Sequence, residues 1–400
     1  MNDSPSACAA PAPCLQGVRV LDLTRLLPGP FASWQLAAMG ADVLRVESPG
    51  LGDYARFMPP MLGPVSALYH VLNRGKRSIV VDLKQDAGRE LVLDLVAQSD
   101  VVFEQFRPGV MARLGLSYEV LAARKPDVIL CSVSGYGQTG PMAGDAGHDM
   151  NFLALSGMLH MQGSLGGGPA LGTPPTADLV GAQTAVIAIL GALLRRASTG
   201  EGQWLDVSLT DAIAGFAAPM VAAWNTAVAA GGEPEPRGRG LLSGGLAQYS
   251  VYETQDGGHL AVGALEPKFF EIFAHLCAHP EWMAVPALLV PEQEALRASV
   301  AAVVAGRTRD EWEAALRGVD CCVTVVRRPD EIGADPQLAA RGFLRSETLV
   351  GAPVHWADTP VGAPLRGSAP LPGAHTDEVL AGLGLTASQI EALRSSGAVA

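Results

Sequence analysis

The stretch VRVLDLTRLLPGPFASWQLAAMGADVLRVE, residues 18–47, decides the fold. Residues 18–23 form an apolar run typical of a buried strand, and residues 31–40 have the pattern of a helix that ends at Gly40. Residues 41–47 form a second apolar run of strand length. A strand, a helix and a strand in this order predict parallel strands joined by a helical crossover.

The same alternation continues along the chain. We expect further strands at residues 77–83, 100–106 and 127–137, and helices at 88–99 and 178–196. A turn, a strand and another helix are expected in STGEGQWLDVSLTDAIAG, residues 198–215. The series predicts an α/β fold with a Rossmann-like, doubly wound parallel sheet, whose ligands bind at the carboxyl ends of the strands. The dinucleotide fingerprint GxGxxG is missing after the first strand, which disfavours a nicotinamide or flavin cofactor.

Composition changes divide the chain into domains. Residues 1–15 are rich in Pro, Ala and Ser and are expected to form a disordered leader, followed by a large domain over residues 16–225. A Gly/Pro-rich linker opens a smaller α+β domain over residues 226–330. Residues 331–400 end in two short helices, the second capped by Thr386.

The overall charge and the cysteines restrict the class of protein. A formal charge of −12 argues against nucleic acid and anionic membranes as partners, because both favour a basic surface. Six scattered cysteines without CxxC spacing predict neither a zinc site nor a disulfide framework, and they fit the reducing cytoplasm. We find no secretory signal and no uninterrupted apolar run of about 18 residues, so we expect no membrane segment.

Three titratable residues stand out as candidates for catalysis. His148 follows a glycine-rich loop and is joined to Asp149 directly before an apolar run, in GHDMNFLALSG. The simpler interpretation is that Asp149 caps a helix and His148 is a loop residue. Asp178 begins a helix, where the helix dipole alone favours a carboxylate, and Glu266 precedes a helix that it could cap.

Basic residues gather near the predicted strand ends. LNRGKRS, residues 72–78, carries three cations, Arg45 lies on a predicted strand and Arg107 follows another. These residues are either solvated surface charges or part of a binding site. If they converge at the carboxyl edge of the sheet, they form a site for the polyanionic part of a cofactor.

Several motifs in one order resemble the family III CoA-transferase superfamily, of the CaiB/BaiF type. They include residues 18–53, NRGKRSIVVDLK, FEQFRPG, SGYGQTGP, GHDMNFLALSG, TGEGQWLDVSL and AVGALEPKFF. Within that superfamily the chain is most similar to the alpha-methylacyl-CoA racemases, which carry a Gly-His-Asp motif like residues 147–149. The stretch PPTADLVGAQ departs from the racemase pattern, because Pro174 and the single Gly181 are more similar to the local sequence of the transferases.

The resemblance assigns roles to residues of this chain. It implies His148, Asp178 and Glu266 as catalytic residues, Tyr249 and Asp149 as substrate-binding residues, and a CoA site lined by Arg25, Arg45, Lys76 and Arg107. It implies no metal and no permanently bound cofactor, with coenzyme A entering as part of the substrate. It also implies an interlocked homodimer in which residues 331–400 return to the large domain and Glu266 comes from the other subunit.

The implied chemistry is racemisation of a 2-methylacyl-CoA. A thioester acidifies the hydrogen on its α-carbon. With His148 as base on one face and Asp178 as acid on the other, that carbon can be inverted through an enolate. Backbone amides at a helix N-terminus would stabilise the enolate oxygen. The alternative is a family III CoA transferase in which Asp178 attacks the thioester and becomes an aspartyl-CoA thioester. A third alternative is a non-catalytic CoA- or nucleotide-binding regulator, which would tolerate loss of both residues.

Overall fold

The computed structural model describes residues 13–164, 166–341, 344–346, 349–350 and 368–400. The chain divides into two compact units. The first contains the described residues up to Ser156, Thr173–Phe216 and Gln337–Ala400, and the second contains Gly157–Gly172 and Ala217–Pro336. Residues 157–172, which the sequence assigns to the large domain, therefore lie in the second unit. Most of the expected leader, residues 1–12, lies outside the described residues.

The core of the first unit is a six-stranded, wholly parallel sheet in the order β5-β2-β1-β6-β7-β8. Its strands are β1 Arg19–Asp22, β2 Asp42–Glu47, β5 Arg77–Val80, β6 Val101–Glu104, β7 Ile129–Ser134 and β8 Gln203–Ser208. Counted along the chain, this is the Rossmann order 3-2-1-4-5-6, in which the direction of winding reverses between β1 and β6. The predicted fold class is confirmed.

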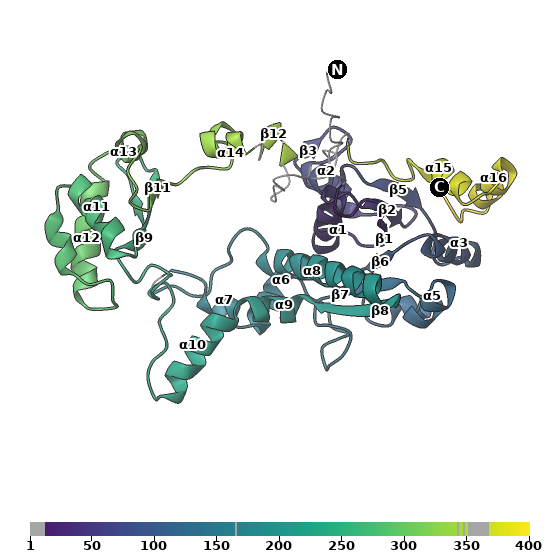
Figure 1. Cartoon of the computed structure of the whole chain (residues 1–400), viewed down its shortest axis with the longest axis horizontal. Helices are drawn as coiled ribbons and strands as arrows, with labels where there is room; N and C mark the ends of the chain where they lie inside the picture. Colours follow the sequence, from purple (N-terminus) through teal and green to yellow (C-terminus); the bar gives the residue numbers. More distant parts are fainter. Residues whose placement is uncertain (1–12, 165, 342–343, 347–348, 351–367) are drawn as a thin grey trace, which may run out of the picture. The chain divides into compact units, whose positions relative to one another are not determined.

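Helices cover both faces of this sheet (Figure 1). One face packs its Leu, Ile and Val side chains against α3 Asp86–Ala97, α5 Tyr118–Arg124, α15 Thr376–Gly382 and α16 Ala387–Ser395. The other carries α1 Pro28–Ala38 and α8 Thr176–Thr199. Thr386 caps α16 as predicted, since its hydroxyl accepts the N–H of Gln389. The C-terminal helices α15 and α16 thus pack against the sheet that β1 begins.

Shorter elements complete the first unit. They are α2 Ala67–Asn73, α4 Val110–Arg113, α6 Asp149–Leu155, α9 Leu209–Phe216, the 3-10 helix Tyr54–Phe57, and the strand pairs β3 Met61–Leu62 with β4 Val65–Ser66 and β12 Leu344–Ser346 with β13 Leu349–Val350. The helix expected at 31–40 begins at Pro28 and the one expected at 178 begins at Thr176. Prolines at or just before both starts explain the shift, because proline suits the first helical turn.

The second unit contains a three-stranded antiparallel sheet in the order β11-β10-β9. The strands of this sheet are β9 Tyr249–Glu253, β10 His259–Gly263 and β11 Val323–Val325. The helices of the unit are α7 Met158–Met161, α10 Ala218–Ala229, α11 Pro267–Leu276, α12 Glu292–Val304 and α13 Arg309–Leu316, with 3-10 turns at Pro280–Ala284 and Ile332–Ala334. Helix α14 Pro336–Ala340 spans the boundary of the two units. Aromatic side chains fill its core: Phe270, Phe273, Trp282 and Trp312 are all buried. The smaller α+β domain is therefore a separately packed unit.

Helix α8 is long and apolar enough to cross a membrane by length and composition. It packs against α1, α6, α9, β7 and β8 in the first unit. Seven of its residues, among them Ala182, Ala185 and Ile189, are buried there. We interpret α8 as a core helix of an α/β unit.

Candidate active site

His148 lies at the N-cap position of α6, at the end of the glycine-rich loop. Its backbone N–H donates to Oδ1 of Asn151 at 3.0 Å, which closes the first turn of the helix. The His148 side chain is exposed. The loop therefore holds an accessible imidazole at a fixed point of the backbone.

The glycine of the Gly-His-Asp motif is required by packing. A Cβ on Gly147 would lie 2.7 Å from the Phe152 ring and 2.7 Å from the Tyr136 hydroxyl. Phe152 is buried in α6 and meets Tyr136 edge to face, with the ring centroids 5.2 Å apart. The loop can lie this close to its own helix only because Gly147 has no side chain.

Asp178 is the third residue of α8 and is partly buried. Its N–H, one of the donors that a helix start leaves unpaired, donates to Oδ1 of Asp149 at 3.1 Å. Burial, and then the nearby charge of Asp149, raise the pKa of the Asp178 carboxyl to about 7. Asp178 is therefore able to hold a proton near neutral pH.

The expectation that Asp149 caps its own helix is wrong. His148 takes the N-cap position and Asp149 is the first helical residue of α6. Its carboxylate instead accepts the N–H of Asp178, which is 29 residues later in the chain and in the first turn of α8. The structure thus joins the residue beside His148 to Asp178 itself, which sequence spacing alone could not reveal.

A cavity of about 290 Å³ opens at the carboxyl edge of the sheet, beside the point where the winding reverses. Its lining comes from the segments after β1, β2, β5 and β6, and includes Thr24, Arg25, Ser48, Gly52, Lys84 and Phe106. Doubly wound sheets bind their ligands at this position. Arg25 and Lys84 are exposed cations on its wall, and Lys84 is one that the sequence analysis missed, although it directly follows the predicted strand RSIVVDL.

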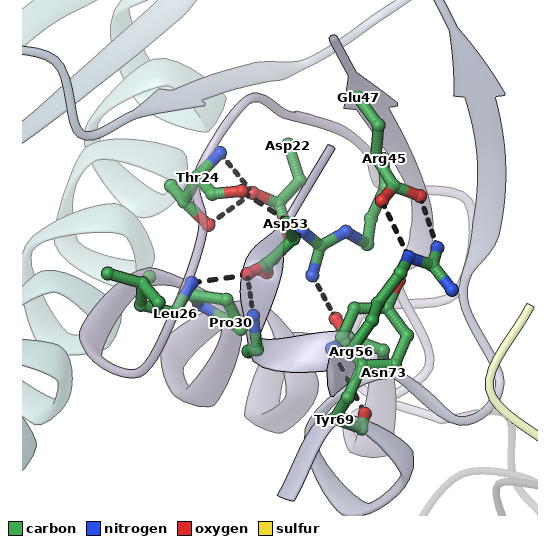
Figure 2. A network of polar contacts seen from close by, with 12 residues as sticks. Asp22, Thr24, Leu26, Pro30, Arg45, Glu47, Asp53, Arg56, Tyr69 and Asn73 are labelled. Atoms are coloured by element: carbon green, nitrogen blue, oxygen red, sulfur yellow. Dashed lines mark hydrogen bonds and ion pairs between the residues drawn. The ribbon is translucent and has the colours of Figure 1, made fainter. Parts of the chain in front are cut away.

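Arg45 and Lys76, two expected CoA ligands, lie inside the protein. Figure 2 shows Arg45 within a network of polar contacts. Arg45 is 1% exposed; it forms an ion pair with Asp53 at 3.0 Å and also donates to Asn73 and to the carbonyl of Thr24. Although Arg45 borders the cavity, these donors are directed at protein acceptors. The contacts of Arg45 therefore do not support direct binding of CoA phosphates.

Lys76 is held in the same way. Its Nζ donates to Oγ of Ser33 at 2.7 Å and to the carbonyl of Pro30 at 3.0 Å, and lies 3.7 Å from Asp22. Burial lowers the pKa of Lys76 to about 7, against the opposing effect of Asp22. We reinterpret Arg45 and Lys76 as residues that shape the edge of the sheet from within.

The buried network includes carboxylates that the sequence analysis overlooked. Arg56 forms a second buried ion pair, with Glu47, and its guanidinium lies 4.0 Å from the centre of the Tyr69 ring. Asp22, at the end of β1, accepts from Thr24 and from Ser33. A buried charge with one partner missing is costly, so this network fixes the loops after β1 and β2. The only sign of this network in the sequence was an acidic residue at the end of β1, Asp22, and at the end of β2, Glu47.

The remaining predicted residues are placed separately. Arg107 is exposed after β6 but is not among the residues that line the cavity. Glu266 and Tyr249 belong to the second unit. Glu266 takes the N-cap position of α11, but its exposed side chain makes no capping hydrogen bond, so the simpler interpretation that it caps its own helix fails. The roles of Glu266 and Tyr249 stay predictions.

A sheet in the Rossmann order with a cavity where the winding reverses defines a doubly wound α/β protein. Asp178 is partly buried and bonded to Asp149, the neighbour of His148, and this arrangement adds a site for acid–base chemistry. Residues 15–376 match the model of CoA-transferase family III. The chain belongs to this family.

Relatives within the family have more than one activity. The chain is 35% identical over 386 residues to an alpha-methylacyl-CoA racemase of Homo sapiens, covering 95% of this chain and 96% of the relative. It is 34% identical to a succinate–glutarate CoA-transferase of Agrobacterium fabrum, covering 96% of this chain and 98% of that one. A CaiB/BaiF family protein from Brucella suis has a similar crystal structure, with a TM-score of 0.82 and 31% identity over 93% of this chain and 100% of that one.

Proposed function

We propose that this protein interconverts the two configurations at the α-carbon of 2-methylacyl-CoA thioesters. The observation that carries the proposal is the 3.1 Å hydrogen bond between Asp178 and Asp149, the neighbour of His148. It supports the pairing of His148 with Asp178, because it joins the starts of the two helices that carry them. A two-base racemase needs such a pair.

The protonation of Asp178 also favours this reaction. Burial and the charge of Asp149 raise the pKa of Asp178 to about 7, so this carboxyl can hold a proton near neutrality and deliver it to the substrate. A racemase works in both directions only if each group can start as the base and finish as the acid.

The reaction proceeds by two proton transfers. Neutral His148 removes the α-hydrogen as a proton, and the electron pair of the broken C–H bond delocalises onto the thioester oxygen as an enolate. Protonated Asp178 then delivers its proton to the opposite face of the same carbon. The enzyme is left with protonated His148 and ionised Asp178, the starting state of the reverse reaction. Glu266 of the partner subunit would polarise His148, and Tyr249 would contact the substrate.

Coenzyme A enters as part of the substrate, and the proposal requires no resident cofactor or metal. Arg25 and Lys84 line the cavity and would bind its phosphates, and Arg107 would join them from the end of β6. Arg45 and Lys76 support this edge from inside the protein.

We further propose an interlocked homodimer located in the cytoplasm. Ile187 and Leu194 on α8 are 69% and 76% exposed, and α10 is an apolar helix with no buried residue. Exposed apolar helix faces are common sites of contact with a partner. The five described cysteines are free, as suits a reducing compartment.

The second candidate is CoA transfer between carboxylic acids, favoured by Pro174 and the reduced glycine run at the start of α8. Ionised Asp178 would attack the thioester carbonyl and expel CoA thiolate, leaving a mixed anhydride. The thiolate would then attack the aspartyl carbonyl, release the first acid and form an aspartyl-CoA thioester, from which an acceptor carboxylate takes the CoA by the reverse steps.

One experiment separates the two. One enantiomer of a 2-methylacyl-CoA is incubated with the protein in deuterium oxide without an acceptor acid, and the α-position is followed by NMR. We expect deuterium entry and loss of optical purity, both reduced at least about 100-fold in His148→Ala and Asp178→Asn. An unlabelled α-carbon, with CoA moving only after a carboxylate is added and unaffected by His148→Ala, would establish the transferase instead.

A further inference from the structure

Asp149 contacts Asp178 from a different helix, both as a hydrogen-bond acceptor and as a negative charge. A substitution can separate these two properties. As a hydrogen-bond acceptor, its Oδ1 satisfies the N–H of Asp178 at 3.1 Å. As an anion, it places a negative charge beside a second carboxyl group in a partly buried site. An amide side chain would keep the first property and lose the second.

The helices and strands that pack most closely against α8 carry few charged groups. Of the elements packed against α8, α1 and β7 carry no charged residue, α6 carries only Asp149, and α9 and β8 carry one aspartate each, Asp211 and Asp206. Both carboxylate oxygens of Asp206 accept the N–H of Gln138. His148 directly precedes α6. Asp149 is the charged group that acts on the Asp178 carboxyl.

We propose that Asp149 is a positioning residue for Asp178: its carboxylate fixes the first turn of α8 and sets a negative charge beside the Asp178 carboxyl. This inference rests on the proposed function for its catalytic meaning, and on the hydrogen bond for its geometry. The role differs from that of a capping residue, because a cap needs only an acceptor.

The sign of the effect follows from electrostatics. A negative neighbour disfavours ionisation, so removing it lowers the pKa of Asp178. The active form holds one proton between His148 and Asp178, and at low pH a second proton binds and removes the base. With a lower pKa at Asp178, the one-proton form persists to more acidic pH. The acid limb of the kcat/KM profile therefore moves to lower pH.

The test compares Asp149→Asn with Asp149→Ala in the full-length protein. Carbonyl-carbon NMR of protein labelled at aspartate, with the Asp178 signal assigned by its loss in Asp178→Asn, reports the protonation of this carboxyl without any substrate. We expect Asp149→Asn to lower the pKa of Asp178 by about one pH unit and to move the acid limb by the same amount. Asp149→Ala should show the same shift and a lower kcat than Asp149→Asn, because the anchor of α8 is gone as well.

Asp211→Asn is the matched control, since it removes one negative charge from α9, which also packs against α8. It should leave the titration of Asp178 unchanged. An unchanged titration in Asp149→Asn would overturn the proposal, as would a shift of equal size in Asp211→Asn. A shifted Asp178 in a protein that shows no exchange at the α-carbon would instead retain the electrostatic role and refute the racemase function.

Discussion

At the scale of residues, burial decides which charges are available to a ligand. Arg45, Arg56 and Lys76 are all buried and paired within the protein, so their charges stabilise loops. Arg25 and Lys84 lie on the cavity wall with exposed side chains. In a chain with a net charge of −12, an anionic ligand depends on such local cations.

The first prediction concerns these two cations. Arg25→Ala and Lys84→Ala should each raise the KM for an acyl-CoA about tenfold with little change in kcat, because each removes a charge-assisted contact to phosphate. Steady-state kinetics at low ionic strength measures this. Arg19→Ala is the matched control, since Arg19 begins β1 at the opposite edge of the sheet from Arg25. An equal effect in the control would mean that only the overall charge matters.

At the scale of elements, the site depends on how closely a loop and two helices approach. Gly147 lies against Phe152 of α6, and Gly181 of α8 lies against Leu209 of α9, where a Cβ would come within 2.1 Å of the leucine Cδ2. A side chain at position 181 would therefore require Leu209 to shift.

The second prediction follows from this packing. Gly147→Ala forces the loop away from Phe152 and Tyr136, and should reduce kcat/KM by about 10- to 100-fold, because a shift near 1 Å misplaces His148. Gly144→Ala in the same loop meets no atom within 4 Å and should have wild-type activity. Kinetics together with thermal unfolding compare the two variants; equal activity would show that the loop position of His148 is not critical.

At the scale of the whole molecule, the chain exposes apolar helix faces that a single copy leaves uncovered. Ile187 and Leu194 lie seven residues apart on α8 and so share one face. If a partner supplies Glu266, activity and association must depend on each other.

The third prediction tests this dependence. The double variant Ile187→Glu, Leu194→Glu should shift the protein toward monomers in sedimentation velocity and lose activity in proportion to the monomer fraction. Leu288→Glu, an apolar residue 59% exposed in a loop of the second unit, is the control and should sediment like the wild type. A fully active monomer would refute the shared site.

The sequence by itself determined the parallel α/β sheet, its six strands and the small α+β unit, because the spacing of apolar residues fixes local structure and side-chain direction. Its motifs also indicated the family and the candidates His148 and Asp178. Only the tertiary structure decided that Asp149 anchors α8, that Arg45 and Lys76 are internal, and that Lys84 lines the cavity. These facts depend on contacts between residues far apart in the chain, and burial is a property of the packed molecule that no local pattern carries.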